Sequence, residues 1–224
     1  MEKRYMRNLP ALTNQQQDLL RTKKAAVIGC GGLGGYLIEY LCRIGIGEIR
    51  VVDGDVFEET NLNRQLLSDT AVLGKSKALC AADRMRSVNP EIRMEAFPVF
   101  LTEENGTRLV SGCDVVLDAL DSISARKILA EVCGREGIPL VYGAISGWVA
   151  QTAVSMPGDG LMDKLYPAET QLRDKSVLSF TPALCASLQA ALCVKLLTGQ
   201  PVETGTLYYF DLLNQEFEAI PMTE

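Results

Sequence analysis

Residues 24–34 read KAAVIGCGGLG, and this stretch decides the fold. The apolar run before Gly29 predicts a buried strand at residues 24–28. Gly29 permits a tight turn, Gly31 lets the backbone approach a phosphate group, and Gly34 lets the next helix pack close to the strand. The amide groups at the start of that helix, expected over residues 33–44, can bind an anion. The stretch therefore predicts the strand–turn–helix unit of a nucleotide-binding sheet.

An acidic residue follows this unit at the distance a nucleotide site requires. Asp53 ends a second predicted strand, residues 48–52, and comes 19 residues after Gly34. A carboxylate in this place can accept hydrogen bonds from ribose hydroxyls. Glycines and acid alone fit an NAD-dependent oxidoreductase equally well, and this enzyme class is the main alternative.

The first two thirds of the chain alternate between strand and helix patterns, which predicts parallel βαβ units in a Rossmann-like doubly wound sheet. Further strands are expected at residues 92–97, 114–119 and 140–144, and further helices at 14–21, 75–88, 102–110 and 122–135.

The rhythm changes after residue 144. We expect a strand at residues 149–156, an irregular segment at 157–177, a long apolar helix at 182–197, and a closing hairpin of strands 206–210 and 216–220. Antiparallel strands would thus continue the parallel sheet. We expect one domain, made of an N-terminal arm and helix (1–22), a nucleotide-binding half (23–145), and a C-terminal part (146–224) with the crossover loop, long helix and hairpin.

The composition argues against several classes of function. The 224 residues carry a net charge of −6, which argues against a nucleic-acid-binding protein, because phosphate neutralisation needs surplus lysine and arginine. The chain contains no histidine, so it cannot hold a Ser-His-Asp triad or a Cys-His pair. No apolar run is long enough for a membrane helix, and the charged N-terminus lacks the pattern of a signal peptide. We expect a soluble cytoplasmic protein.

Polar residues after Asp53 favour a triphosphate over NAD. Asn61, Asn63, Arg64 and Gln65 form a cluster for which a dehydrogenase has no obvious use. Arg64, together with Lys77 near the start of the next helix, supplies more positive charge than the two phosphates of NAD require.

The fourth predicted strand ends in carboxylates. Asp118 and Asp121 lie at the carboxyl edge of the parallel sheet, where ligands bind in open α/β folds. A carboxylate beside a polyphosphate is a natural Mg²⁺ ligand, which makes Asp121 the candidate metal residue. Asp121 could equally be the N-cap of the following helix.

Taken in order, these segments resemble the ThiF/MoeB/HesA family, the bacterial relatives of ubiquitin-activating enzymes. The similar segments are GCGGLGG, DGD at 53–55, NLNRQ at 61–65, GKSK at 74–77 and DALDS at 118–122. The resemblance begins with RYMRN at 4–8, similar to an RYxRQ opening, and ends with LYYFDLLNQEF at 207–217. It covers almost the whole chain.

The resemblance implies a function. Members use ATP to adenylate the C-terminal carboxylate of a small ubiquitin-like sulfur carrier, a β-grasp protein ending in Gly-Gly, and they are usually homodimers. Thiamine and molybdopterin biosynthesis both use such carriers. A tRNA-modifying dehydratase of the same superfamily and a non-catalytic nucleotide-binding scaffold are further alternatives.

The resemblance also implies residue roles. Asp53 would bind the ribose, Asp121 would bind Mg²⁺, and Arg7 would reach into the active site of the partner subunit. Asn61, Arg64 and Lys77 would hold phosphates and stabilise charge as pyrophosphate leaves. The remaining residues expected to border the nucleotide are Gly29, Gly31, Gly32, Gly34, Asp55 and Gln65.

The chain departs from many family members at its cysteines. None of the seven cysteines forms a CxxC pair, so we expect no zinc site. The crossover loop contains no cysteine that could bond to the carrier. Cys185 could replace the missing loop cysteine as the nucleophile. The apolar helix in which it is expected to lie favours a buried core thiol instead. Sulfur is then expected from another protein, a sulfurtransferase or a cysteine desulfurase.

Overall fold

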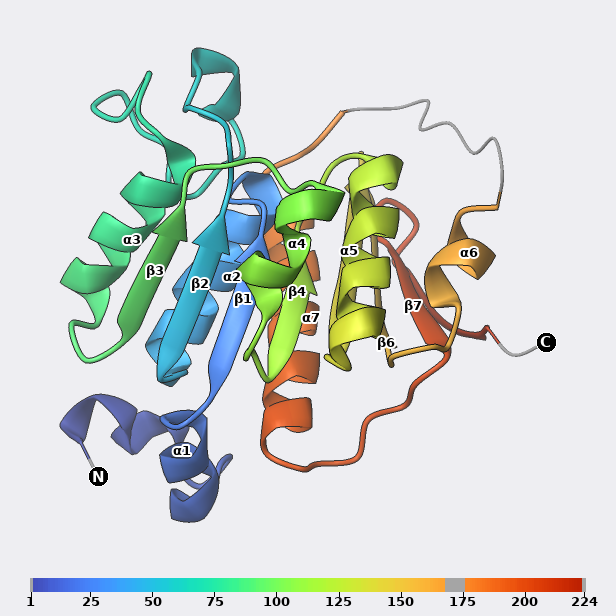
Figure 1. Cartoon of the computed structure of the whole chain (residues 1–224), viewed down its shortest axis with the longest axis horizontal. Helices are drawn as coiled ribbons and strands as arrows, with labels where there is room; N and C mark the ends of the chain where they lie inside the picture. Colours follow the sequence, from blue (N-terminus) through green and yellow to red (C-terminus); the bar gives the residue numbers. More distant parts are fainter. Residues whose placement is uncertain (1, 168–175, 223–224) are drawn as a thin grey trace.

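The computed structural model describes residues 2–167 and 176–222. Eight strands form one sheet in the order β3-β2-β1-β4-β5-β6-β7-β8, with helices on both faces (Figure 1). The predicted fold class, a Rossmann-like sheet that is parallel first and antiparallel later, is confirmed.

Five strands form the parallel half of the sheet. The register of each neighbouring pair is parallel from β3 through to β5. The strand order 3-2-1-4-5 reverses direction between β1 and β4, which creates a crevice at their carboxyl ends. The strands are β1 (Lys24–Ile28), β2 (Glu48–Val52), β3 (Arg93–Phe97), β4 (Val115–Asp118) and β5 (Leu140–Ser146).

The C-terminal third extends the same sheet with antiparallel strands. β6 (Val149–Ser155) pairs with β5, β7 (Thr206–Asp211) pairs with β6, and β8 (Glu216–Pro221) forms the outer edge. Gly147, at a φ of +53°, makes the turn between β5 and β6.

Helices cover both faces of the sheet, and each face has its own apolar core. One core lies under α2 (Gly32–Ile44), α3 (Lys77–Val88) and α7 (Phe180–Leu197). The other lies under α4 (Glu103–Val110) and α5 (Ile123–Glu136). By length and hydropathy alone α7 could cross a bilayer, but half of it is buried, and it packs on α2, β5 and β6, which accounts for its apolar composition.

The N-terminal elements lie at the far end of the sheet from the carboxyl ends of the parallel strands (Figure 1). They are η1 (Lys3–Asn8) and α1 (Asn14–Leu20). Tyr5 anchors them, because its ring packs on Gly45 after α2 and its hydroxyl accepts a hydrogen bond from Asn89 after α3.

Three short helices were not predicted. These are η1, η2 (Glu59–Asn61) and α6 (Leu161–Leu165), and the expectation that residues 157–177 are irregular throughout is wrong over α6. Pro157 and the two left-handed glycines at 158 and 160 hide its periodicity. Residues 168–175 of that segment lie outside the described residues.

Candidate functional site

A cavity of about 450 Å³ opens at the carboxyl ends of β1, β2 and β4, at the reversal of strand order. The predicted nucleotide-binding residues meet there. Those that line it are Gly29, Gly31, Gly32, Asp53, Asp55, Asn61, Arg64, Gln65, Lys77 and Asp121.

The glycine turn after β1 has three separate steric requirements. Gly29 has a φ of +103°, and a Cβ there would lie 2.5 Å from the carbonyl oxygen of Ala119. A Cβ on Gly34 would lie 1.8 Å from the Gly29 carbonyl oxygen. Gly31 meets only the Gln65 side chain, at 3.6 Å, so its face is open to a ligand. Gly34 was expected at the nucleotide but is not in the cavity wall: it sets how closely α2 approaches β1.

Asp53 fixes the loops on either side of the crevice. Its Oδ2 accepts a hydrogen bond of 2.7 Å from the Cys30 amide, and its Oδ1 accepts one of 2.8 Å from the Asp55 amide. Each carboxylate oxygen keeps a lone pair for a ribose hydroxyl. The acid is thus both a structural clamp and a candidate ligand group.

Two predicted cations lie on the wall of the cavity. Lys77 is 7% exposed and its Nζ lies 3.2 Å from Oδ2 of Asp55, whose side chain is mostly exposed. Arg64 lies over Gly32 at the start of α2, and its guanidinium donates to Thr60 and Asn63. Arg64 therefore lies near the amide-rich N-terminus of α2, where phosphates bind, and Lys77 lines the same cavity.

Two buried amides complete this wall. The Asn61 side chain closes η2 by accepting a hydrogen bond from the Glu58 amide. Gln65 is 6% exposed, and its Oε1 has no hydrogen-bond partner among the described residues. A buried acceptor without a donor is costly, so Gln65 is suited to accept a hydrogen bond from a ligand.

Asp121 is the available carboxylate of the site. It is exposed in the cavity and makes no hydrogen bond or ion pair within the described part of the chain. The alternative role as an N-cap is wrong, because the hydroxyl of Ser122 caps α5 by accepting from Ala125. A carboxylate facing this cavity fits the oxygen ligands that Mg²⁺ prefers.

Arg126 on α5 also lines the cavity and was not predicted. It is 4% exposed, donates 2.7 Å to the Gly143 carbonyl, and pairs with Asp118 at 3.3 Å. Burial raises the pKa of the Asp118 carboxyl, and the guanidinium of Arg126 opposes this effect. A signal existed in the sequence: an aspartate inside the apolar strand VVLD needs a cationic partner.

Arg7 does not lie at the cavity of its own chain. It is exposed on η1, at the opposite end of the sheet (Figure 1). Its expected role is in the site of a partner subunit, and this role stays a prediction.

Six of the seven cysteines are buried. Cys185 is fully buried, and burial raises its pKa to about 12, in agreement with the expectation of a core thiol. Cys80 on α3 is half-buried, whereas the other six are buried. Within residues 2–167 and 176–222, no three cysteine or acidic side chains gather as metal ligands. The absence of zinc stays a prediction.

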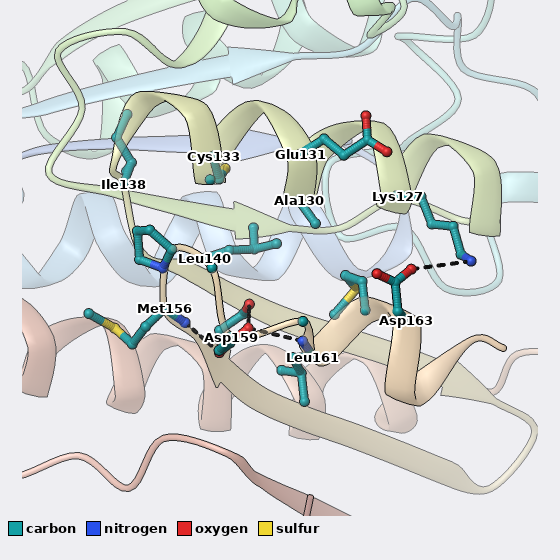
Figure 2. A pocket seen from close by; sticks show the side chains of 16 residues that line it. Lys127, Ala130, Glu131, Cys133, Ile138, Leu140, Met156, Asp159, Leu161 and Asp163 are labelled. Atoms are coloured by element: carbon teal, nitrogen blue, oxygen red, sulfur yellow. Dashed lines mark hydrogen bonds and ion pairs between the residues drawn. The ribbon is translucent and has the colours of Figure 1, made fainter. Parts of the chain in front are cut away.

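A second cavity of about 200 Å³ lies between α5 and the β6–α6 loop (Figure 2). Two of its three carboxylates, Asp159 and Asp163, already have partners. Asp159 accepts hydrogen bonds from Ser155, Met156 and Leu161, and Asp163 pairs with Lys127. These contacts indicate that Asp159 fixes the loop between β6 and α6, and they do not indicate a binding site.

Comparison with known proteins gives a consistent picture. A family model described as the ThiF family matches residues 3–224. The chain is 35% identical to the sulfur carrier protein adenylyltransferase of Thermus thermophilus, over 97% of this chain and 86% of that protein. It is also 35% identical to the SAMP-activating enzyme E1 of Haloferax volcanii, over 92% and 78%.

Longer relatives and solved structures extend the comparison. The adenylyltransferase and sulfurtransferase MOCS3 of Xenopus laevis is 34% identical over 97% of this chain, which spans half of that protein. Among solved structures, E. coli MccB with ATP has a TM-score of 0.85 at 21% identity, covering 100% of this chain and 73% of that one. At this identity the likeness shows the shared fold.

Proposed function

Because the chain belongs to the ThiF family, we propose that it uses ATP to adenylate the C-terminal carboxylate of a small ubiquitin-like sulfur carrier ending in Gly-Gly. Pyrophosphate is released. The names of the Thermus and Haloferax relatives support this activity. The observation that carries it is the convergence of Asp53, Arg64, Lys77 and Asp121 on one cavity at the strand-order reversal.

The reaction suits a site without a histidine. A C-terminal carboxylate is ionised near neutral pH, so it is a nucleophile that needs no general base. It attacks the α-phosphorus of ATP, and the bond to the pyrophosphate oxygen breaks. Catalysis then consists of alignment and of stabilising charge on the phosphoryl oxygens. Arg64 and Lys77 supply that stabilisation, and Asp121 would hold Mg²⁺, which neutralises phosphate charge.

The two cations and the carboxylate of Asp121 also favour adenylation over hydride transfer. Hydride transfer to NAD has no use for Arg64, Lys77 and Asp121 together. The adenylyltransferase names of the relatives likewise favour this activity over an oxidoreductase or a tRNA-modifying dehydratase.

The cellular setting is part of the proposal. The carrier is a β-grasp protein of thiamine, molybdopterin or related cofactor biosynthesis. The enzyme works in the cytoplasm as a homodimer, without a nucleic-acid or membrane partner. Sulfur comes from a separate sulfurtransferase or cysteine desulfurase, because six of the seven cysteines are buried and the crossover loop contributes none.

ATP–pyrophosphate exchange tests the proposal. Exchange should require a carrier ending in Gly-Gly, and a carrier lacking its last glycine should be inert. Lys77→Ala and Arg64→Ala should each lower exchange on the order of a hundredfold, as expected for losing one stabiliser of transition-state charge. Lys75→Ala is the matched control, because Lys75 is exposed and lies outside the cavity wall.

Two results would contradict the proposal. Exchange that needs no carrier would mean that the acyl group comes from elsewhere. Wild-type exchange in both cation variants would place the reaction away from this cavity.

A further inference from the structure

The cavity continues beyond the nucleotide-binding residues to the end of β5. We call this part the β5 lobe; its lining residues are Leu120, Arg126, Ala144, Ile145, Tyr166 and Val177. Adjacent strands lie about 4.8 Å apart, so the three spacings from β2 to β5 place the lobe roughly 14 Å from Asp53. A nucleotide with its ribose at β2 and its phosphates at the β1 turn leaves this lobe for a second substrate.

Arg126 is the charged side chain of the β5 lobe, and it is held rigidly. Its guanidinium donates to the Leu120 and Gly143 carbonyls and to Asp118. The ring of Tyr142 lies 5.3 Å from its central carbon, and the Tyr142 hydroxyl bonds to that of Tyr166 at 2.6 Å. These contacts fix the guanidinium before any ligand arrives.

One nitrogen of this fixed group has no partner. Nε of Arg126 is buried and has no hydrogen-bond partner among the described residues. Buried N–H groups are nearly always paired in folded proteins, so an unpaired one beside a cavity marks a place for an acceptor oxygen. The rest of the lobe is largely apolar and offers Ala144, Ile145 and Val177 as walls.

We infer that Arg126 binds an oxygen of the acyl substrate's C-terminal end through its Nε–H, and so places the terminal carboxylate toward the α-phosphorus. The inference rests on the proposed function. A peptide tail without side chains, such as Gly-Gly, carries backbone carbonyl and carboxylate oxygens past apolar walls. Arg126 is therefore a binding residue for the second substrate and not for ATP.

Arg126→Lys is the decisive variant. It keeps a positive charge beside Asp118 but removes the Nε–H of the guanidinium. Exchange is measured against the concentration of purified β-grasp carriers ending in Gly-Gly, of the thiamine and molybdopterin types. ATP affinity is measured by calorimetry and stability by the urea midpoint. We expect the KM for the carrier to rise about tenfold or more, as for a lost hydrogen bond to a charged group, with ATP affinity unchanged.

Asp118→Asn is the control for a purely structural role, because it weakens the buried pair and leaves the Nε–H in place. We expect it to lower the urea midpoint with a smaller change in carrier KM. A wild-type carrier KM in folded Arg126→Lys would overturn the inference. So would a parallel loss of ATP and carrier binding in both variants.

Ile145→Trp tests the lobe without touching Arg126, and it keeps the inference testable if Arg126→Lys does not fold. Filling the lobe should raise the carrier KM and leave ATP affinity unchanged; the reverse result would overturn the assignment. If the wild-type enzyme shows no carrier-dependent exchange, the proposed function itself fails, and the inference fails with it.

Discussion

At the residue scale, the ion pair between Lys77 and Asp55 shows how the site can be both stable and ready for a ligand. Lys77 is nearly buried, so its charge needs a partner while the cavity holds no phosphate. Asp55 is mostly exposed, so the pair contributes little stability and can be exchanged for a phosphate oxygen at small cost. Asp55 thus supports the charge of Lys77, and it also lines the cavity; its place at the border of the nucleotide stays a prediction.

The buried thiols lead to a prediction on chemical reactivity. Burial raises the pKa of Cys133, Cys185 and Cys193 to about 12, so at pH 8 they are almost wholly protonated and unreactive. Iodoacetamide should therefore modify Cys80 first in the native protein, and all seven cysteines after denaturation. Mass spectrometry of the peptides measures this directly. Fast native labelling of Cys185 would show that its helix is open to solvent.

Residue roles were predictable where they belong to a local pattern. The glycines and Asp53 lie at fixed spacing on one βαβ unit, and the structure brings Asp53 and all of these glycines except Gly34 to one cavity. Arg126 was missed because its position within α5 suggests an exposed surface charge. Its role depends on contacts with Gly143 and Asp118, which only the folded sheet brings together.

At the element scale, the close packing of α2 on β1 leads to a prediction on stability. Gly34→Ala would place a Cβ 1.8 Å from a backbone oxygen, which only a shift of the helix can relieve. We expect a loss of about 1–3 kcal/mol, typical of overpacking, together with weaker ATP binding because the turn moves with the helix. Urea denaturation and calorimetry measure the two effects.

Gly134→Ala on α5 is the matched control. A Cβ there meets nothing within 4 Å, and the residue lies in a helix. We expect this substitution to stabilise the protein by up to about 1 kcal/mol through helix propensity. Equal destabilisation by both substitutions would show that the close contact at Gly34 is not the cause.

The sequence predicted the strands and the long helices well and the short helices poorly. β1 and β2 have the predicted bounds, and α7 begins two residues earlier than expected. Five residues, as in α6, give too short a pattern to show helical periodicity, and packing of Leu161 and Met162 into a core stabilises the helix. Tertiary contacts of this kind leave no local signal.

At the scale of the whole molecule, the sheet order follows from general rules of connection. Right-handed crossovers between parallel strands give the order 3-2-1-4-5, and the reversal between β1 and β4 fixes where the cavity opens. How a second subunit would lie against this one is not encoded in these rules, because it depends on surface shape. Arg7, exposed and remote from the cavity of its own chain, therefore needs a test in solution.

We expect the enzyme to be a homodimer in which Arg7 of each subunit completes the site of the other. Arg7→Ala and Arg64→Ala chains alone should each show on the order of a hundredth of wild-type exchange. Mixed in equal amounts after reversible dissociation, they should recover about a quarter of wild-type exchange, because half of the dimers are mixed and one of their two sites is whole. Sedimentation measures the dimer mass. The control takes the Arg7→Ala chain alone through the same dissociation and reassociation, which should recover no exchange.

The outcome separates two arrangements. If Arg7 acted within its own chain, a mixed dimer would contain one site lacking Arg7 and another lacking Arg64, and mixing would recover nothing. The position of Arg7 on η1, at the opposite end of the sheet from Asp121, argues against that arrangement. Recovery on mixing would show that the positive charge at the phosphates is shared between subunits, so that only the assembled dimer is active.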